Sequence, residues 1–380
     1  MANNNNTKNL NVPTLRFPEF TGEWKLVQLS QIADFVGGGT PSSSNASFWN
    51  GSIPWISSSD IKDGNIYDIS ITRFITKEAI DKSTTKLCPA PVILLVSRVG
   101  VGKVALSNKK LCTSQDFCNL INIKCNPNFL AYDLVRTMKQ KSREAQGTSI
   151  KGVTSYEIQK IRFWLPEKKK EQDKIATFLS LLDHRIATQN KIIEKLQSLI
   201  KGLRVCCMQR VYGNNVYLSE IAQIYQPQTI SSTELTEDGF LVYGANGIIG
   251  KYKDYNHETE QICITCRGNT CGMVNYTKPM SWITGNAMVI NTDKYQDKVC
   301  KRYLYHYLSA YNFNSIISGS GQPQIVRTPL EKLKITLPTI SEQKQKAIIF
   351  DKIQDKIDIN HKVLNLYIGQ KQYLLRQMFI

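Results

Sequence analysis

Residues 171–207 read EQDKIATFLSLLDHRIATQNKIIEKLQSLIKGLRVCC, and this stretch decides the fold. Its apolar side chains recur in alternating steps of four and three, at Ile175, Leu179, Leu182, Ile186, Ile193, Leu196, Ile200, Leu203 and Cys207. This heptad spacing keeps one apolar stripe facing a partner helix, and Gln189 is its one clearly polar member. Because no proline interrupts the stretch, it predicts a single helix of about 40 residues and ~60 Å.

A second stretch near the carboxyl end has the same seven-residue pattern. Its seam consists of Phe350, Ile353, Ile357, Asn360, Leu364, Tyr367, Lys371, Leu374 and Met378. Asn360 and Lys371 are its polar members, and Asn360, like Gln189, lies near the middle of its helix. We expect the two helices to pair, although each could instead pack on its own globular domain. The residues predicted to pair the helices are Leu179, Leu182, Ile186, Gln189, Ile193, Leu196, Ile353, Ile357, Asn360 and Leu364.

The rest of the sequence also contains an internal repeat. Residues 29–33 (LSQIA) return as residues 218–222 (LSEIA), and the pair Glu171-Gln172 returns as Glu342-Gln343. Such internal repeats decide an architecture before local structure does. We therefore predict two globular domains, residues 1–166 and 213–338, each followed by a long helix, within residues 167–212 and 339–380.

Each globular copy has short Ile-, Val- and Tyr-rich runs between glycine-rich turns, which is typical of strands. One helix is expected near residues 129–141 and its echo near residues 301–310. The predicted fold class is therefore α+β, with two repeated mixed α/β domains joined and spaced by two long helices.

Composition and charge narrow the function. The 380 residues contain 48 Lys and Arg against 31 Asp and Glu, a net charge of +17, which favours a polyanionic partner such as nucleic acid. The excess of basic residues lies mainly in residues 1–166, with 20 basic against 12 acidic residues, and is nearly absent from residues 213–338, with 11 against 10.

The first residues do not show the basic start and apolar core of a signal peptide, so no signal peptide is predicted. The longest apolar run is too short to span a membrane. A cytoplasmic protein with reduced cysteines and no membrane association is expected.

Three motifs come close to an active site. Residues 126–129 (NPNF) resemble the amino-binding loop of amino-methyltransferases, but the third position is Asn and no glycine-rich methyl-donor motif precedes them. Residues 100–103 (GVGK) lack the other residues of a phosphate-binding loop. Cys263, Cys266 and Cys271 have suggestive spacing but no fourth zinc ligand nearby. We predict no catalytic residue and no metal ligand in this chain.

Several quoted segments together resemble a known family. They are residues 13–20 (PTLRFPEF), 38–42 (GGTPS), 48–51 (FWNG), 53–58 (IPWISS), 115–119 (QDFCN), 243–250 (YGANGIIG), 286–290 (NAMVI) and 374–379 (LLRQMF). These segments, their order along the chain and the internal repeat together resemble the specificity (S) subunit of type I restriction–modification systems. The resemblance covers nearly the whole chain, although the close of the first helix, residues 204–208, departs from the usual ending.

The resemblance implies a non-catalytic, DNA-reading subunit of an enzyme complex. Each globular domain would be a target recognition domain for one half of a bipartite site in double-stranded DNA. The helices, antiparallel in the family, would set the gap between the half-sites and dock methylation (M) subunits, two in all, with restriction (R) subunits joining them. S-adenosylmethionine, ATP and Mg²⁺ would belong to those partners, so no cofactor is expected here. The alternative is a coiled-coil scaffold or adaptor whose basic surface is incidental; a stand-alone methyltransferase is a distant third.

Candidate DNA contacts come from charged and amide side chains in glycine-flanked loops. Basic side chains there are suited to phosphates, while hydroxyls and amides offer the donor–acceptor pairs that base edges require. The predicted contacts are Ser58, Ser59, Arg98, Lys103, Gln115, Lys151, Asn246, Lys251, Arg267, Asn286, Gln322 and Gln324.

Overall fold

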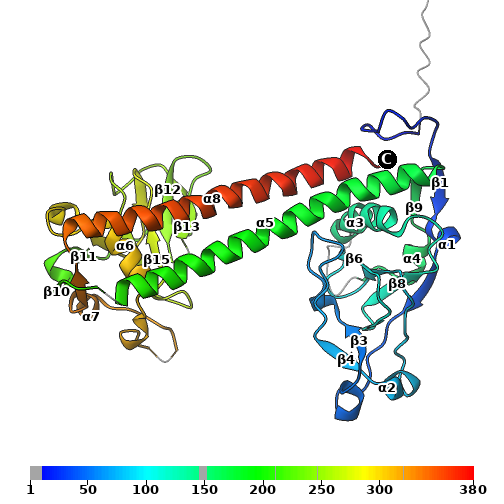
Figure 1. Cartoon of the computed structure of the whole chain (residues 1–380), viewed down its shortest axis with the longest axis horizontal. Coiled ribbons are helices and arrows are strands. Elements are labelled where there is room, and N and C mark those ends of the chain that lie inside the picture. Colours follow the sequence, from blue (N-terminus) through cyan, green and yellow to red (C-terminus); the bar gives the residue numbers. More distant parts are fainter. Residues whose placement is uncertain (1–10, 145–151, 210, 246, 320) are drawn as a thin grey trace, which may run out of the picture. The chain divides into compact units, whose positions relative to one another are not determined.

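The computed structural model describes residues 11–144, 152–209, 211–245, 247–319 and 321–380 (Figure 1). Contacts divide the chain into two units: residues 1–189 with 363–380, and residues 190–362. Both boundaries fall within the long helices, so each unit contains one globular domain and half of each helix. The predicted α+β class is confirmed, while the predicted domain boundaries stay a prediction.

In the described part of the first unit there are nine strands. They are β1 (Lys25–Gln28), β2 (Asp34–Gly37), β3 (Ile53–Ile56), β4 (Arg73–Ile75), β5 (Val92–Val96), β6 (Val104–Ser107), β7 (Cys112–Thr113), β8 (Phe117–Ile121) and β9 (Arg162–Leu165). They form a four-stranded sheet β2-β8-β5-β6, a three-stranded sheet β4-β3-β7 and the pair β1-β9. All pairings are antiparallel except β3 with β7. Strand β5, sequence VILLV, is buried throughout, as expected of a central strand covered on both faces.

The second unit repeats this topology strand for strand. Its strands are β10 (Asn214–Tyr217), β11 (Gln223–Tyr225), β12 (Phe240–Gly244), β13 (Gly247–Tyr252), β14 (Ile262–Thr265), β15 (Val274–Tyr276), β16 (Ser281–Ile283), β17 (Ala287–Asn291) and β18 (Lys334–Leu337). The sheets are β11-β17-β14-β15, β13-β12-β16 and β10-β18, and the parallel pair is again the equivalent one, β12 with β16. The internal repeat inferred from sequence is therefore a repeat of structure.

Short helices complete each unit. The first has α1 (Leu29–Ile32), α2 (Lys77–Asp81), α3 (Pro127–Glu144) and α4 (Ser155–Gln159); the second has α6 (Lys301–Ala310) and α7 (Arg327–Glu331). Helix α3 contacts β5 and β6, and α6 contacts the equivalent strand β15. The helices expected near residues 129–141 and 301–310 are thus α3 and α6.

The long helices are α5 (Lys169–Gln209) and α8 (Ile340–Gln377). In the first unit, Leu179 and Leu182 near the start of α5 share a core with Leu374 near the end of α8. In the second unit, Ile200 near the end of α5 shares a core with Phe350 near the start of α8. The helices therefore pack antiparallel, as the resemblance implied (Figure 1).

The seam residues predicted from the sequence are buried to different degrees. Leu179, Leu182, Gln189, Ile193 and Ile357 are buried, and Ile186, Leu196, Ile353, Asn360 and Leu364 are half-buried. Counted from the repeated glutamines Gln172 and Gln343, which lie 171 positions apart, Gln189 and Asn360 occupy equivalent places. The two helices thus have the same seam, in the same phase, relative to their own domains.

The repeated glutamines fasten each long helix to its domain. Gln172 accepts a hydrogen bond from the Asn126 backbone N–H (2.9 Å) and donates one to the Pro166 carbonyl (2.8 Å). Gln343 does the same with the Cys300 N–H (2.8 Å) and the Pro338 carbonyl (2.9 Å). Both amides are buried, so each satisfies backbone groups that would otherwise lose water without compensation. The Glu-Gln repeat in the sequence is therefore a structural joint.

Candidate nucleic-acid interface

Three loops of the first unit meet at the ends of β3, β5 and β7. The Ser114 backbone N–H donates to the Ile56 carbonyl (2.8 Å), which joins the loop after β7 to the end of β3. The Ser97 N–H donates to the Asp116 carbonyl (2.8 Å), which adds the loop after β5. Lys103 Nζ donates to the Ser58 carbonyl (3.0 Å), which ties the far side of that loop to the turn after β3. One continuous loop surface results.

This surface brings together five of the predicted DNA contacts. Ser59, Arg98 and Gln115 are exposed, Lys103 is half-buried and Ser58 is buried with its carbonyl held by Lys103. The Thr40 hydroxyl donates to Gln115 Oε1 (2.5 Å), which orients that amide. Lys151 lies outside the described residues. The loop that carries Lys103 depends on Gly100 and Gly102, whose φ angles of 86° and 108° are rare for residues with a Cβ.

Arg73 on β4 holds the turn that contains Ser58 and Ser59, a role that was not predicted from the sequence. Its Nη2 donates to Ser57 Oγ (2.6 Å) and pairs with Asp60, while the guanidinium lies 4.7 Å from the centre of the Trp55 ring. A charged hydrogen bond and a cation–π contact together fix such a turn more firmly than either alone. Only opposite charges at positions 60 and 73 hinted at the pair, and such charges are common.

The second unit gathers its loops at the equivalent strand ends. The Thr265 hydroxyl donates to the Ala245 carbonyl (2.5 Å), joining the end of β14 to the turn between β12 and β13. The Gly268 N–H donates to the Pro323 carbonyl (3.0 Å), and the Cys266 N–H donates to the Asn286 carbonyl (3.1 Å). These contacts bring the loops after β14, before β17 and before α7 into one surface.

Four predicted contacts belong to this second surface, and one does not. Arg267, Asn286, Gln322 and Gln324 are exposed there, and Arg267 and Gln324 face each other in an isolated antiparallel bridge. Lys251 lies apart: it pairs with Leu241 away from the β12–β13 turn, and its ammonium is 3.1 Å from Asp238 Oδ1. Asn246 lies outside the described residues.

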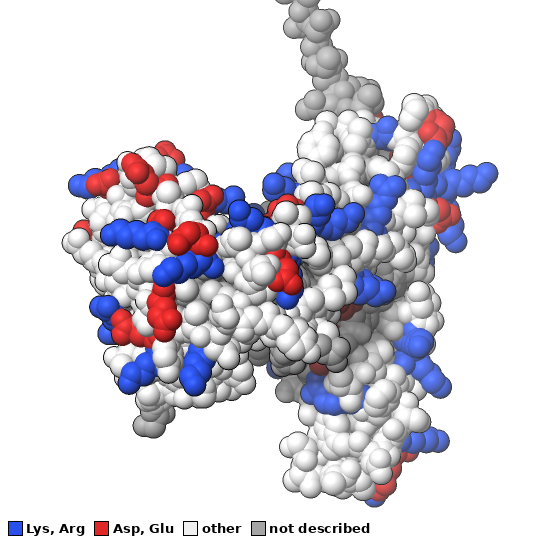
Figure 2. Space-filling model, turned by 60° about the vertical axis from the view of Figure 1, so that its left-hand side comes forward, with Lys and Arg blue, Asp and Glu red and all other residues white. Residues whose placement is uncertain are grey.

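The charge asymmetry expected from sequence is visible on the surface. On the face shown in Figure 2, Lys and Arg side chains of the second unit are interspersed with Asp and Glu. The part of the first unit in view carries mostly Lys and Arg. Phosphate attraction should therefore come more from the first unit than from the second.

Two of the three motifs that came close to an active site, residues 126–129 and the cysteines near β14, have structural roles. Asn126 begins α3: its Oδ1 accepts from the Phe129 N–H (2.9 Å) and its Nδ2 donates to Asp173 Oδ1 (2.7 Å). Cys263 packs within β14 against Tyr243 and Val289, and burial raises the pKa of its thiol to about 12. Within the described ranges, no three His, Cys, Asp or Glu residues are grouped so that they could hold a metal ion.

Two repeated α/β units with loop surfaces at equivalent strand ends, each joined to half of an antiparallel helix pair, define a two-part recognition protein. The family model for the type I restriction modification DNA specificity domain matches residues 21–198 and 214–366. The chain belongs to this family, so its two globular domains are target recognition domains of a DNA specificity subunit. Such a subunit is itself non-catalytic, and S-adenosylmethionine and ATP bind the methylation and restriction subunits.

Individual relatives agree with this assignment. The chain is 27% identical over 363 residues to the EcoprrI specificity subunit of Escherichia coli, covering 87% of each chain. It is 34% identical over 184 residues to the MjaIX specificity subunit of Methanocaldococcus jannaschii, a match that spans 42% of that relative. A crystal structure of an S subunit from M. genitalium has the same fold, with a TM-score of 0.64 at 18% identity over 97% of this chain and 99% of that one.

Proposed function

We propose that each loop surface reads one half of a bipartite site in double-stranded DNA. The observation that carries this proposal is the equivalence of the two surfaces: the first lies at the ends of β3, β5 and β7, and the second at the ends of β12 and β14 and before β17. Nine of the twelve residues chosen from sequence for DNA contact lie on them. Two different surfaces in one chain allow the two half-sites to differ, which a homodimer does not allow.

We further propose that α5 and α8 fix the gap between the half-sites. Helix α5 has 41 residues and α8 has 38, and each passes from one unit into the other without a break. At ~1.5 Å per residue, α5 is about 60 Å long, which matches roughly 18 base pairs at 3.4 Å each. A paired helix is stiff enough to act as a spacer, whereas a flexible linker is not.

The proposed partners are two methylation subunits, which dock on the outer faces of the long helices, and restriction subunits that join them in the cytoplasm. Large apolar side chains are exposed on these faces: Leu181, Ile192 and Leu199 on α5, and Ile348, Ile349, Ile359 and Leu366 on α8. Contiguous exposed apolar patches are typical of protein contacts, and we infer that these side chains contribute to such contacts. No helix in the described residues is long and apolar enough to cross a membrane.

Docking is tested by placing charges on this face. Leu199→Glu with Ile349→Glu should abolish co-purification of the methylation subunits, because burying two carboxylates in an apolar contact costs several kcal/mol. Ile248→Glu, on β13 and equally exposed at 55%, is the matched control and should leave co-purification intact. Retained co-purification of the double variant would place the docking surface elsewhere.

DNA reading by the first surface is tested at Lys103. In the assembled complex, Lys103→Ala should weaken binding to specific and non-specific DNA alike, because a phosphate contact carries no sequence information. The slope of log K against log salt should fall by about 1. Lys82→Ala removes an exposed lysine directly after α2 that pairs with Glu78, and should change neither quantity. A selective loss on the specific sequence would instead mean that Lys103 acts at a base edge or through the Ser58 turn that it holds.

A further inference from the structure

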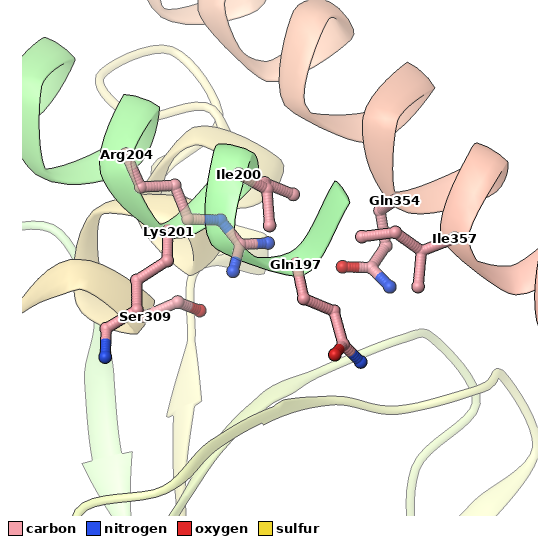
Figure 3. Close-up of a pocket in the computed structure, with 7 residues that line it drawn as sticks. All are labelled: Gln197, Ile200, Lys201, Arg204, Ser309, Gln354 and Ile357. Atoms are coloured by element: carbon pink, nitrogen blue, oxygen red, sulfur yellow. The ribbon is translucent and has the colours of Figure 1, made fainter. Parts of the chain in front are cut away.

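A pocket of about 320 Å³ lies in the second unit between α5, α8 and α6 (Figure 3). Its polar lining consists of Gln197, Lys201 and Arg204 from α5, Ser309 from α6 and Gln354 from α8. In Figure 3 the Arg204 guanidinium extends from α5 between Lys201 and Gln197, and the Gln354 side chain enters from α8. Among the described residues, two cations and no carboxylate line this cavity.

Arg204 has no carboxylate of its own. Its Nε donates to His306 Nδ1 (3.1 Å), and the other ring nitrogen of His306, Nε2, lies 2.8 Å from Asp351 Oδ1. The ring must therefore accept from Arg204 and donate to Asp351, which is the neutral tautomer with its proton on Nε2. Burial, which is the larger effect, together with the nearby guanidinium groups, lowers the pKa of His306 despite Asp351 and favours this neutral form. The Arg204 guanidinium is therefore hydrogen-bonded to a neutral imidazole ring.

The carboxylate on the far side of His306 is paired with another arginine. Arg302 binds Asp351 through Nε (2.9 and 3.0 Å) and Nη2 (2.5 Å), so the charge of Asp351 is already balanced. Arg204 Nη2 is buried and has no hydrogen-bond partner in the described part of the chain. A buried guanidinium N–H without a partner is costly, because an arginine remains charged in a protein. Asp358, which accepts from Gln354 Nε2 at 3.1 Å, is exposed and does not line the pocket.

The first unit has a buried ion pair at the equivalent level of its long helices. Counted from Gln172 and Gln343, 171 positions apart, Gln354 is the equivalent of Asp183. In the first unit Asp183 is buried, accepts from the Tyr132 hydroxyl (2.8 Å) and pairs with Lys371 (2.5 Å). The equivalent of Lys371 is Ile200, so the second unit has two neutral residues, Gln354 and Ile200, where the first unit has an ion pair. The pocket cations Arg204 and Lys201 are additions of the second unit, since their equivalents in the first are Leu375 and Gln372.

We propose that this pocket binds a small oxyanion, a carboxylate or a phosphate, held by Arg204 and Lys201 with the Ser309 hydroxyl as a further donor. Guanidinium groups are suited to both anions, since their planar N–H pairs match two oxygens. The volume accommodates a phosphate or a short dicarboxylate, and the apolar wall of Ile200 and Ile357 restricts water around the charges. This site is independent of DNA reading and requires no partner chain.

The test is thermal unfolding of the full chain in potassium phosphate and potassium succinate, compared with potassium chloride at matched ionic strength. Ligand at 100 times its Kd stabilises by about 2.7 kcal/mol, which corresponds to a Tm rise of roughly 5–10 °C for a unit of this size. A rise in phosphate alone or in succinate alone identifies which oxyanion the site takes. Because such anions also stabilise proteins non-specifically, the decisive quantity is the rise relative to variants of the site.

Three variants complete the test. Arg204→Gln should lose the anion-specific rise, and Lys191→Gln, an exposed lysine on the same helix, should retain it. Gln354→Glu places a carboxylate where the first unit has one, so it should raise Tm in chloride and abolish the response to added anions. This variant keeps the test valid even if Arg204→Gln fails to fold. Equal rises in the wild-type chain and Gln354→Glu, or no rise in the wild-type chain, would overturn the proposal.

Discussion

Asp183→Ala is expected to destabilise the first unit by about 3–5 kcal/mol, the usual cost of removing one partner from a buried ion pair. Lys371 is 5% exposed and Asp183 1%, and Lys371 Nζ is bonded to Asp183 Oδ1 (2.5 Å) and the Gly64 carbonyl (2.6 Å). Without Asp183 the ammonium is left in a nonpolar setting with one carbonyl. The measurement is the denaturant midpoint of the first unit's unfolding transition.

Two further variants separate the ion pair from general damage. Asp183→Leu with Lys371→Met removes both charges and should recover most of the lost stability, because apolar replacements of buried pairs are often neutral or better. Glu78→Ala breaks the exposed Lys82–Glu78 pair, whose side chains are more than half exposed, and should cost at most about 1 kcal/mol. Equal losses of stability in the Asp183→Ala variant and the double variant would mean that the stability of the first unit does not depend on this ion pair.

Deletion of residues 186–192 together with residues 357–363 is expected to shorten the recognised gap by one to three base pairs. These heptads occupy equivalent places in the two copies, 171 positions apart, so their joint removal keeps both seams in phase. Seven residues at ~1.5 Å are about 10 Å of helix, or roughly three base pairs at 3.4 Å each. The gap is measured by mapping methylated bases in DNA from cells that contain the complex.

Single deletions provide the control for this experiment. Removing only residues 186–192 keeps the heptad phase but makes one helix about 10 Å shorter than its partner, so the two seams are shifted by one heptad relative to each other or to their domains, and methylation should fall sharply. An active double-deletion complex with an unchanged gap would refute the role of the helices as a spacer.

The long helices and the repeat were predictable because they depend on local periodicity. The spacing of Leu179, Leu182 and Ile193 follows from helix geometry alone, and the structure buries all three. The repeated Glu-Gln pair marked the start of each long helix, and the structure shows why: Gln172 and Gln343 make the same two backbone contacts.

The contacts that hold distant segments together were not predictable in this way. Lys371 stood out as a polar member of a seam, but its partner Asp183 is 188 positions away in the chain and has no sequence signal. The same is true of Arg73 and Asp60, and of the pairing of Arg204 with His306. Such pairs are fixed by tertiary packing, whereas a single sequence shows only local patterns.

We propose that each target recognition domain specifies one half of the DNA site. This is tested by mapping methylated bases in cells that carry the partner subunits, with residues 25–165 or residues 214–337 replaced by the equivalent segment of a relative. These segments run from β1 to β9 and from β10 to β18, so each exchange transfers a whole domain and leaves both helices in place. We predict a two-part methylated motif in which only one half changes with each exchange. An unaltered motif after either exchange, with the complex assembled and active, would contradict the account.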